Sequence, residues 1–236
     1  MDLKYVELFY KDITSQKTET RSIALSLLNL MNQDLAKSLA TWVAQNSRFP
    51  ESIREEAKAI RNRLGGLSSY TFAPVHDAYV RLSTPTSNFA TASALRGRAT
   101  IDDTLKGYLK FDVAGLDGSV VSAKLRLHVT NASDDGGSVR LVSNSLLGTT
   151  TPWTQTELNW NNAPVIGGTI LSSAGAVAVG NIVEFDVTPA ITGNGTYSFG
   201  LKNNSRDDVH YSSKEWANPP QLVIQLKLTD KKVVLP

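Results

Sequence analysis

The period of the hydrophobic pattern changes once along this chain, near residue 68, and that change constrains the fold more than any other feature. Before it, apolar residues recur at the spacing of an amphipathic helix, as in residues 18–32. After it, apolar and polar residues alternate, as in residues 123–130, which is the pattern of a strand with one buried face. The sequence therefore predicts a small all-α domain at residues 1–66 and an all-β domain at residues 67–236.

The helical half contains its clearest predicted helix at residues 50–64. Pro50 suits a first helical turn, since its missing N–H would have no helical partner there, and Gly65-Gly66 predicts the end of the helix. Three further helices are predicted before it, at residues 2–12, 18–32 and 34–46. Short helices with tight breaks are similar to HEAT-type helical arrays, whose units usually need neighbours to bury their faces. Residues 1–66 are therefore expected to form either a self-contained cap or a docking domain that binds other protein subunits.

Five segments of the second half alternate between apolar and polar residues. They are residues 108–113, 123–130, 183–187, 197–201 and 222–228. Turn-forming sequences rich in Gly, Asn, Asp and Pro separate them. Many short strands with this spacing predict an all-β antiparallel sandwich of two sheets, jelly-roll-like in its connections, that follows the helical domain.

Five motifs of the second half follow one another between residues 73 and 224. They read PVHDAYVRLSTPTSNFA, GYLKFDVAGLDGSVVSAKLRLHVTN, WTQTELNWNNAP, VEFDVTPAITGNGTYSFGLK and YSSKEWANPPQLVI. This series resembles the DNRLRE-type module, a β-sandwich carbohydrate-binding domain associated with acidic polysaccharides such as alginate. The chain departs from the family pattern at Lys214, where arginine is usual, and at Trp216, where a small residue is usual. The resemblance implies a non-catalytic module that binds a polysaccharide.

The composition excludes several other functions. The formal net charge is +2, which is too small by itself to indicate nucleic-acid binding. The absence of cysteine excludes thiolate catalysis and disulfide frameworks. The three histidines lack a metal-ligand spacing, and no serine lies in a nucleophile elbow. We therefore expect no enzyme activity and no cofactor, although a structural calcium stays open, with Asp77 as the candidate ligand.

Basic side chains gather on the predicted polar faces of the strands. The six candidate ligand-binding residues are Tyr108, Lys110, Lys124, Arg126, His128 and Arg140. The first two share a face of one strand and the next three share a face of another. If the connection AGLDGSVVS is hairpin-like, these faces join into one exposed basic strip, which Arg140 extends. Such a strip suits the carboxylates of an acidic polysaccharide; the alternative is a solvated or covered sheet face that happens to be basic.

Two of the four tryptophans lie close together in the segment TPWTQTELNWNNAP, residues 151–164. Flat aromatic rings often contact sugars, but sandwich cores also bury tryptophan. Trp160 has the strand parity of Leu158, so it is expected in the sandwich core. For Trp153, packing against the end of the sandwich and contact with a sugar both stay open.

A structural or decoration subunit of a virion, tail or surface filament is the alternative function. The helical domain would then dock into the assembly, and the C-terminal tail around residues 233–235 would pair with a neighbour's sheet edge, unless it frays as chain ends do. The N-terminus lacks the apolar core of a signal peptide, and no apolar run approaches the length of a membrane span. We expect an extracellular or particle-surface location, with no membrane and no nucleic-acid partner.

Overall fold

The computed structural model describes residues 40–45, 47, 49–63 and 67–228. The described residues divide into two compact units, of which the larger, Ser69–Leu226, is the β-sandwich. The helices expected at residues 2–12 and 18–32, and the tail expected to pair with a neighbour, lie outside the described residues. The domain boundary between residues 66 and 67 stays a prediction.

The clearest predicted helix is confirmed. Helix α4 spans Glu51–Arg63 and follows Pro50, whose carbonyl accepts the N–H groups of Ile53 and Arg54 at 3.1 Å each. Residues 40–45 are also helical and fall within another predicted helix. Neither segment tests the likeness to HEAT units, which stays a prediction. Among the residues that the structure describes, no helix is long and apolar enough to span a bilayer.

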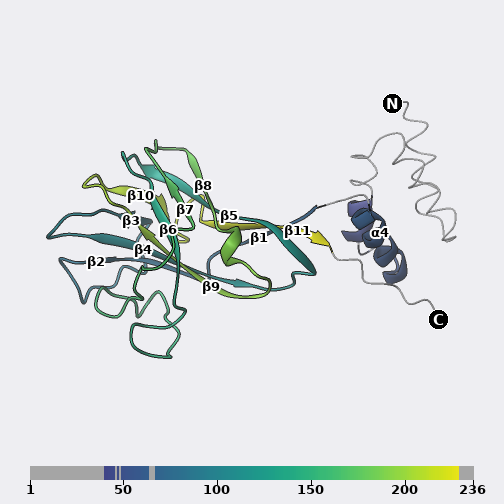
Figure 1. The fold of residues 1–236 in the computed structure, drawn as a ribbon, viewed down its shortest axis with the longest axis horizontal. Helices are drawn as coiled ribbons and strands as arrows, with labels where there is room; N and C mark the ends of the chain where they lie inside the picture. The colour runs from purple at the N-terminus through teal and green to yellow at the C-terminus, as the bar shows by residue number, and fades with distance from the viewer. Residues whose placement is uncertain (1–39, 46, 48, 64–66, 229–236) are drawn as a thin grey trace. The chain divides into compact units, whose positions relative to one another are not determined.

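Two sheets form the sandwich (Figure 1). The first sheet contains, in spatial order, β1 (Leu67–Phe72), β11 (Gln221–Leu228), β5 (Gly118–Asn131), β10 (Val209–Ser212) and β3 (Ala94–Gly97), with β8 (Ile182–Asp186) paired to β5. The second sheet contains, in spatial order, β2 (His76–Arg81), β4 (Leu105–Val113), β9 (Gly195–Lys202), β6 (Gly137–Val142) and β7 (Ser172–Ala174). The 3-10 helix η1 (Thr188–Ala190) follows β8. The predicted antiparallel sandwich, preceded by a small helical part, is confirmed.

The core between the sheets contains the apolar residues that alternate along the strands. On β5, Leu125, Leu127 and Val129 are fully buried, while the residues between them are partly exposed. Phe111 on β4 meets Phe199 on β9 edge to face, with ring centroids 6.2 Å apart. Burial of one such side chain stabilises the fold by about 1.5–3 kcal/mol. The alternating segments therefore assemble into two layers because each has one apolar face to cover.

The consecutive strands β4 and β5 belong to different sheets. β4 pairs with β2 and β9, whereas β5 pairs with β10 and β8. Residues 114–117 therefore carry the chain from the second sheet to the first and do not form a hairpin. The prediction of one joined basic strip is wrong, because alternation specifies the buried side of a strand and leaves its neighbour unspecified.

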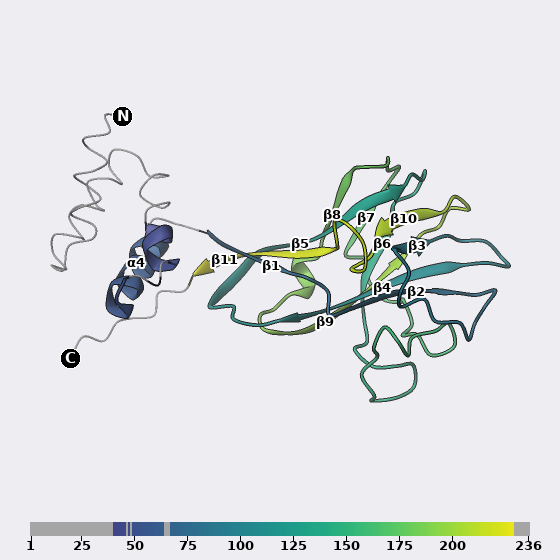
Figure 2. The ribbon, with the colours of Figure 1, turned by 180° about the vertical axis from the view of Figure 1, so that it is seen from behind.

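A long loop between β6 and β7, residues 143–171, packs on the outer face of the second sheet. Figure 2 shows this 143–171 loop, in green, beside β4 and β2. A second apolar cluster lies at this contact and contains Ala78, Val80, Tyr108, Val142, Trp153, Leu158 and Ala163. Gly200 on β9 permits the close approach, since a Cβ there would lie 2.6 Å from Cγ1 of Ile166. The second sheet is therefore covered on both faces over much of its area.

The two tryptophans of the 143–171 loop differ from the sequence-based expectation. Trp153 is fully buried, whereas Trp160 is only half-buried. Residues 151–164 form turns instead of a strand, so strand parity does not apply and the placement of Trp160 in the sandwich core is wrong. Trp153 packs edge to face on Tyr108, and its Nε1–H donates to the carbonyl of Ser143 at 3.1 Å. Trp153 therefore anchors the loop to the sheet.

Candidate functional site

Two of the six candidate ligand-binding residues lie beneath the 143–171 loop. Tyr108 is 1% exposed, and its hydroxyl donates to the carbonyl of Pro164 at 2.8 Å. Lys110 is 4% exposed; its ammonium donates to the carbonyls of Asn144 and Trp153 and lies 4.3 Å from the Trp153 ring centroid. Burial raises the pKa of Tyr108 and lowers that of Lys110. The expectation that both residues are exposed is wrong, because the loop covers this part of the strand.

Three other candidates, Lys124, Arg126 and His128, line the outer side of β5 as expected. Strand β8 places carboxylates directly opposite two of them: Asp186 is the register partner of Lys124, and Glu184 is that of Arg126. The Lys124 ammonium lies 2.7 Å from Asp186, and Arg126 Nε lies 3.0 Å from Glu184. The hydrogen bond from Lys124 is the main cause that lowers the pKa of Asp186 to about 2. The predicted basic charge of this strand is therefore compensated within the first sheet.

A pocket of about 120 Å³ lies at the outer face of the first sheet. Its lining residues are Arg126, His128, Ile182, Asn218, Pro219 and Gln221. The lining combines apolar carbon with donors and acceptors from four polar side chains. Sites for small polar ligands share this combination of an apolar lining and a few placed polar groups. The pocket therefore brings two of the predicted residues, Arg126 and His128, into one concave site.

The sixth candidate, Arg140, lies on β6 in the second sheet and is separate from the β5 residues. Its Nη1–H donates to Ser138 Oγ at 2.9 Å. Ser138 is the register partner of Lys202 on β9, which in turn is the register partner of Lys106 on β4. Sequence reasoning missed these two lysines as candidates. Lys106 carried a usable signal, since it has the same strand parity as Tyr108 and Lys110.

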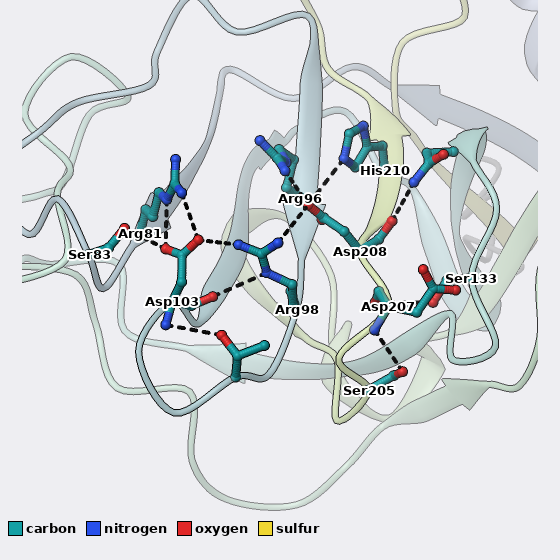
Figure 3. A network of polar contacts seen from close by, with 12 residues as sticks. Arg81, Ser83, Arg96, Arg98, Asp103, Ser133, Ser205, Asp207, Asp208 and His210 are labelled. Atoms are coloured by element: carbon teal, nitrogen blue, oxygen red, sulfur yellow. Dashed lines mark hydrogen bonds and ion pairs between the residues drawn. The ribbon is translucent and has the colours of Figure 1, made fainter.

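Arginine and aspartate side chains form a network at one end of the sandwich (Figure 3). Asp103 accepts hydrogen bonds from Arg81 and Arg98, and Asp208 forms an ion pair with Arg96 and lies 3.4 Å from Nε2 of His210. The hydrogen bond from Arg81 is the main cause that holds the pKa of Asp103 well below its ordinary value. Because each charge in this network has a partner inside it, we interpret the network as part of the scaffold.

Asp77, the candidate calcium ligand, is buried in β2 with 1% exposure. Its Oδ2 accepts the backbone N–H of Lys214 at 2.8 Å. Burial, opposed by that hydrogen bond and aided by the nearby Glu215 carboxylate, raises the pKa of Asp77 to about 7. Among the described residues, no three His, Asp or Glu side chains converge as a metal site would require. A calcium at Asp77 stays a prediction.

The raised pKa of Asp77 predicts an unusual dependence of stability on pH. The folded state holds a proton between the ordinary carboxyl pKa, about 4, and about 7, so this contribution to stability is lost as the pH rises through 7. Lowering the pH from about 8 to about 6.5 should raise the free energy of unfolding by roughly 1 kcal/mol, measured by urea denaturation. The variant Asp77→Asn should lack this rise. Below about pH 6.5 His76 opposes this effect, because its pKa in the folded state is lowered, mainly by burial. If Asp77→Asn showed an equal rise in the free energy of unfolding, the pH dependence would come from a group other than Asp77.

Comparison with known proteins agrees with this architecture. Residues 68–226 match the family described as carbohydrate-binding module family 96. A gellan lyase from Bacillus sp is 25% identical over 169 residues, which is 65% of this chain and 6% of that protein. The chain thus spans a small part of the length of this curated relative. The matched residues coincide with the β-sandwich and exclude α4.

Proposed function

Because this chain belongs to carbohydrate-binding module family 96, we propose that its β-sandwich holds a polysaccharide without cleaving it. The pocket beside Arg126 and His128 is the observation that carries the proposal. Ile182 and Pro219 offer apolar contact to the C–H face of a sugar ring, while the polar lining residues pair with its hydroxyl groups.

We further propose that the polysaccharide is acidic and that the protein acts at an extracellular or particle surface. Arg126 can exchange its Glu184 partner for a ligand carboxylate, because an exposed ion pair contributes only about 0–1 kcal/mol. A ligand carboxylate would form the same kind of charge-assisted contact with Arg126 as the Glu184 carboxylate that it replaces. The sequence similarity to a gellan lyase makes gellan the first polysaccharide to test.

Affinity electrophoresis tests the pocket directly. The full chain should be retarded in native gels that contain gellan or polygalacturonate, and the double variant Arg126→Ala/His128→Ala should lose about tenfold or more in affinity, about 1.4 kcal/mol, with an unchanged melting temperature. Lys124→Ala is the matched control, since it removes a charge from the same strand outside the pocket lining. Equal retardation of the double variant and the wild type would contradict the pocket. A wild-type chain that no polysaccharide retards would contradict the function.

A further inference from the structure

Three cationic side chains from neighbouring strands share the outer face of the second sheet. Lys106 and Lys202 are register partners on β4 and β9, and Lys202 is also the register partner of Ser138 on β6. Arg140, two residues along β6, is anchored through Nη1 to Ser138 Oγ. Directly opposite side chains in a sheet lie close together, and like charges in that position are destabilising. We call Lys106, Lys202 and Arg140 the lysine–arginine cluster.

The lysine–arginine cluster lacks a compensating carboxylate among the residues that the structure describes. None of its three cations forms an ion pair there, whereas Lys124 and Arg126 on the first sheet each have one. Burial, and next the charge of Lys202, lower the pKa of Lys106. The folded protein therefore holds positive charges together at a cost in stability that an anion placed between them would relieve.

The surroundings of Lys106 fix its ammonium in position. Its Nζ lies 4.0 Å from the centroid of the Trp160 ring, within the range of a cation–π interaction. Trp160 itself is half-buried and packs against the apolar cluster beneath the 143–171 loop. Gly200, between Lys202 and Ser198 on β9, leaves room for Ile166 of that loop to contact the sheet. The cluster is thus built on strands and on an anchored loop, so little ordering is needed on binding.

We propose that the lysine–arginine cluster is a second polysaccharide-binding surface, which takes the carboxylate or sulfate groups of an acidic glycan. The choice of a glycan as the ligand rests on the proposed function; the site does not, since it lies on the other sheet from the pocket. A net charge of +2 is too small to indicate a nucleic acid. With the pocket on one outer face and the cluster on the other, one module contacts two segments of polysaccharide. Simultaneous contacts of this kind raise the overall affinity without strengthening either one.

Charge-matched variants of the full chain test this surface. We expect Lys106→Gln/Lys202→Gln to bind polygalacturonate about tenfold or more weaker than the wild type, since two charge-assisted contacts are removed. Lys124→Gln/Lys227→Gln removes the same charge from the first sheet outside the pocket lining and serves as the control, with a smaller loss. Fully methyl-esterified polygalacturonate, which keeps the backbone and loses the charge, should bind the wild type and Lys106→Gln/Lys202→Gln equally. Dextran sulfate as a further probe separates sulfate from carboxylate recognition.

The melting temperature distinguishes a variant that has lost only the second binding surface from one that has lost its fold. Because the substitutions remove both the repulsion and the opposing Lys106–Trp160 cation–π interaction, the melting temperature of Lys106→Gln/Lys202→Gln should change little. Wild-type affinity of this variant for both anionic probes would overturn the second surface. Binding lost in Arg126→Ala/His128→Ala but kept in Lys106→Gln/Lys202→Gln would also overturn it while supporting the pocket. The reverse result would support the second surface and overturn the pocket alone.

Discussion

Replacing Trp153 by alanine is expected to destabilise the sandwich by about 3–5 kcal/mol, the usual range for truncation of a fully buried tryptophan. Three contacts depend on this residue: its ring lies against Tyr108 and against the Lys110 ammonium, and its indole N–H is bound by the carbonyl of Ser143. Without the indole, the ammonium of Lys110 stays buried beside a cavity. The cost therefore includes the lost transfer energy of the indole, a void and the loss of the cation–π interaction.

The other tryptophans of the sandwich are natural controls for this measurement. Trp160→Ala should cost less, because its ring is half-buried, and Trp216→Ala should change stability by less than about 0.5 kcal/mol, because Trp216 is 60% exposed. Urea denaturation of the three variants, monitored by far-UV circular dichroism, measures their free energies of unfolding and so ranks their losses of stability. If Trp153→Ala were no more destabilising than Trp216→Ala, the loop would not be anchored as described. Limited proteolysis should also cut Trp153→Ala within residues 143–171 sooner than the wild type.

The interior of the sandwich was predictable from the sequence because it depends on local alternation. Leu125, Leu127 and Val129 have the period of a strand with one buried face, and they are buried. Lys124, Arg126 and His128 have the opposite parity, and they line the outer side. Parity within one strand involves only that strand, so a single sequence specifies it.

Strand partners and long loops were not predictable in the same way. Nothing near Lys124 in the sequence indicates that Asp186 is its register partner, since the two residues are brought together by pairing of β5 with β8. Likewise, Tyr108 and Lys110 have the parity of exposed residues, and only the return of the 143–171 loop buries them. The sequence therefore predicted the fold better than it predicted the candidate site. The exposure and the charge balance of the site residues depend on segments that are distant in the sequence and that cover or neutralise them.

Replacing Asp103 by asparagine is expected to destabilise the fold by about 2 kcal/mol, less than the roughly 3–5 kcal/mol of a fully buried pair because Arg81 is partly exposed. Asp103 accepts two hydrogen bonds from Arg81, at 2.6 and 2.7 Å, one from Ser83 at 2.5 Å and one from Arg98 (Figure 3). Asparagine keeps the shape but presents N–H donors and no charge to two guanidinium groups. The substitution therefore leaves Arg81 and Arg98 without their shared counter-charge.

The pH dependence of this loss of stability tests whether the charge of the Asp103 carboxylate is its cause. Since the folded pKa of Asp103 lies below its unfolded value, its stabilising contribution is present above about pH 4 and is lost as the pH falls further. The difference in unfolding free energy between the wild type and Asp103→Asn should therefore stay constant from about pH 7 to about pH 4 and shrink from there to about pH 3. Asp102→Asn is the matched control, because Asp102 is adjacent, exposed and without an ion pair among the described residues. A difference that stays constant down to about pH 3 would assign the effect to shape or hydrogen bonding instead of charge.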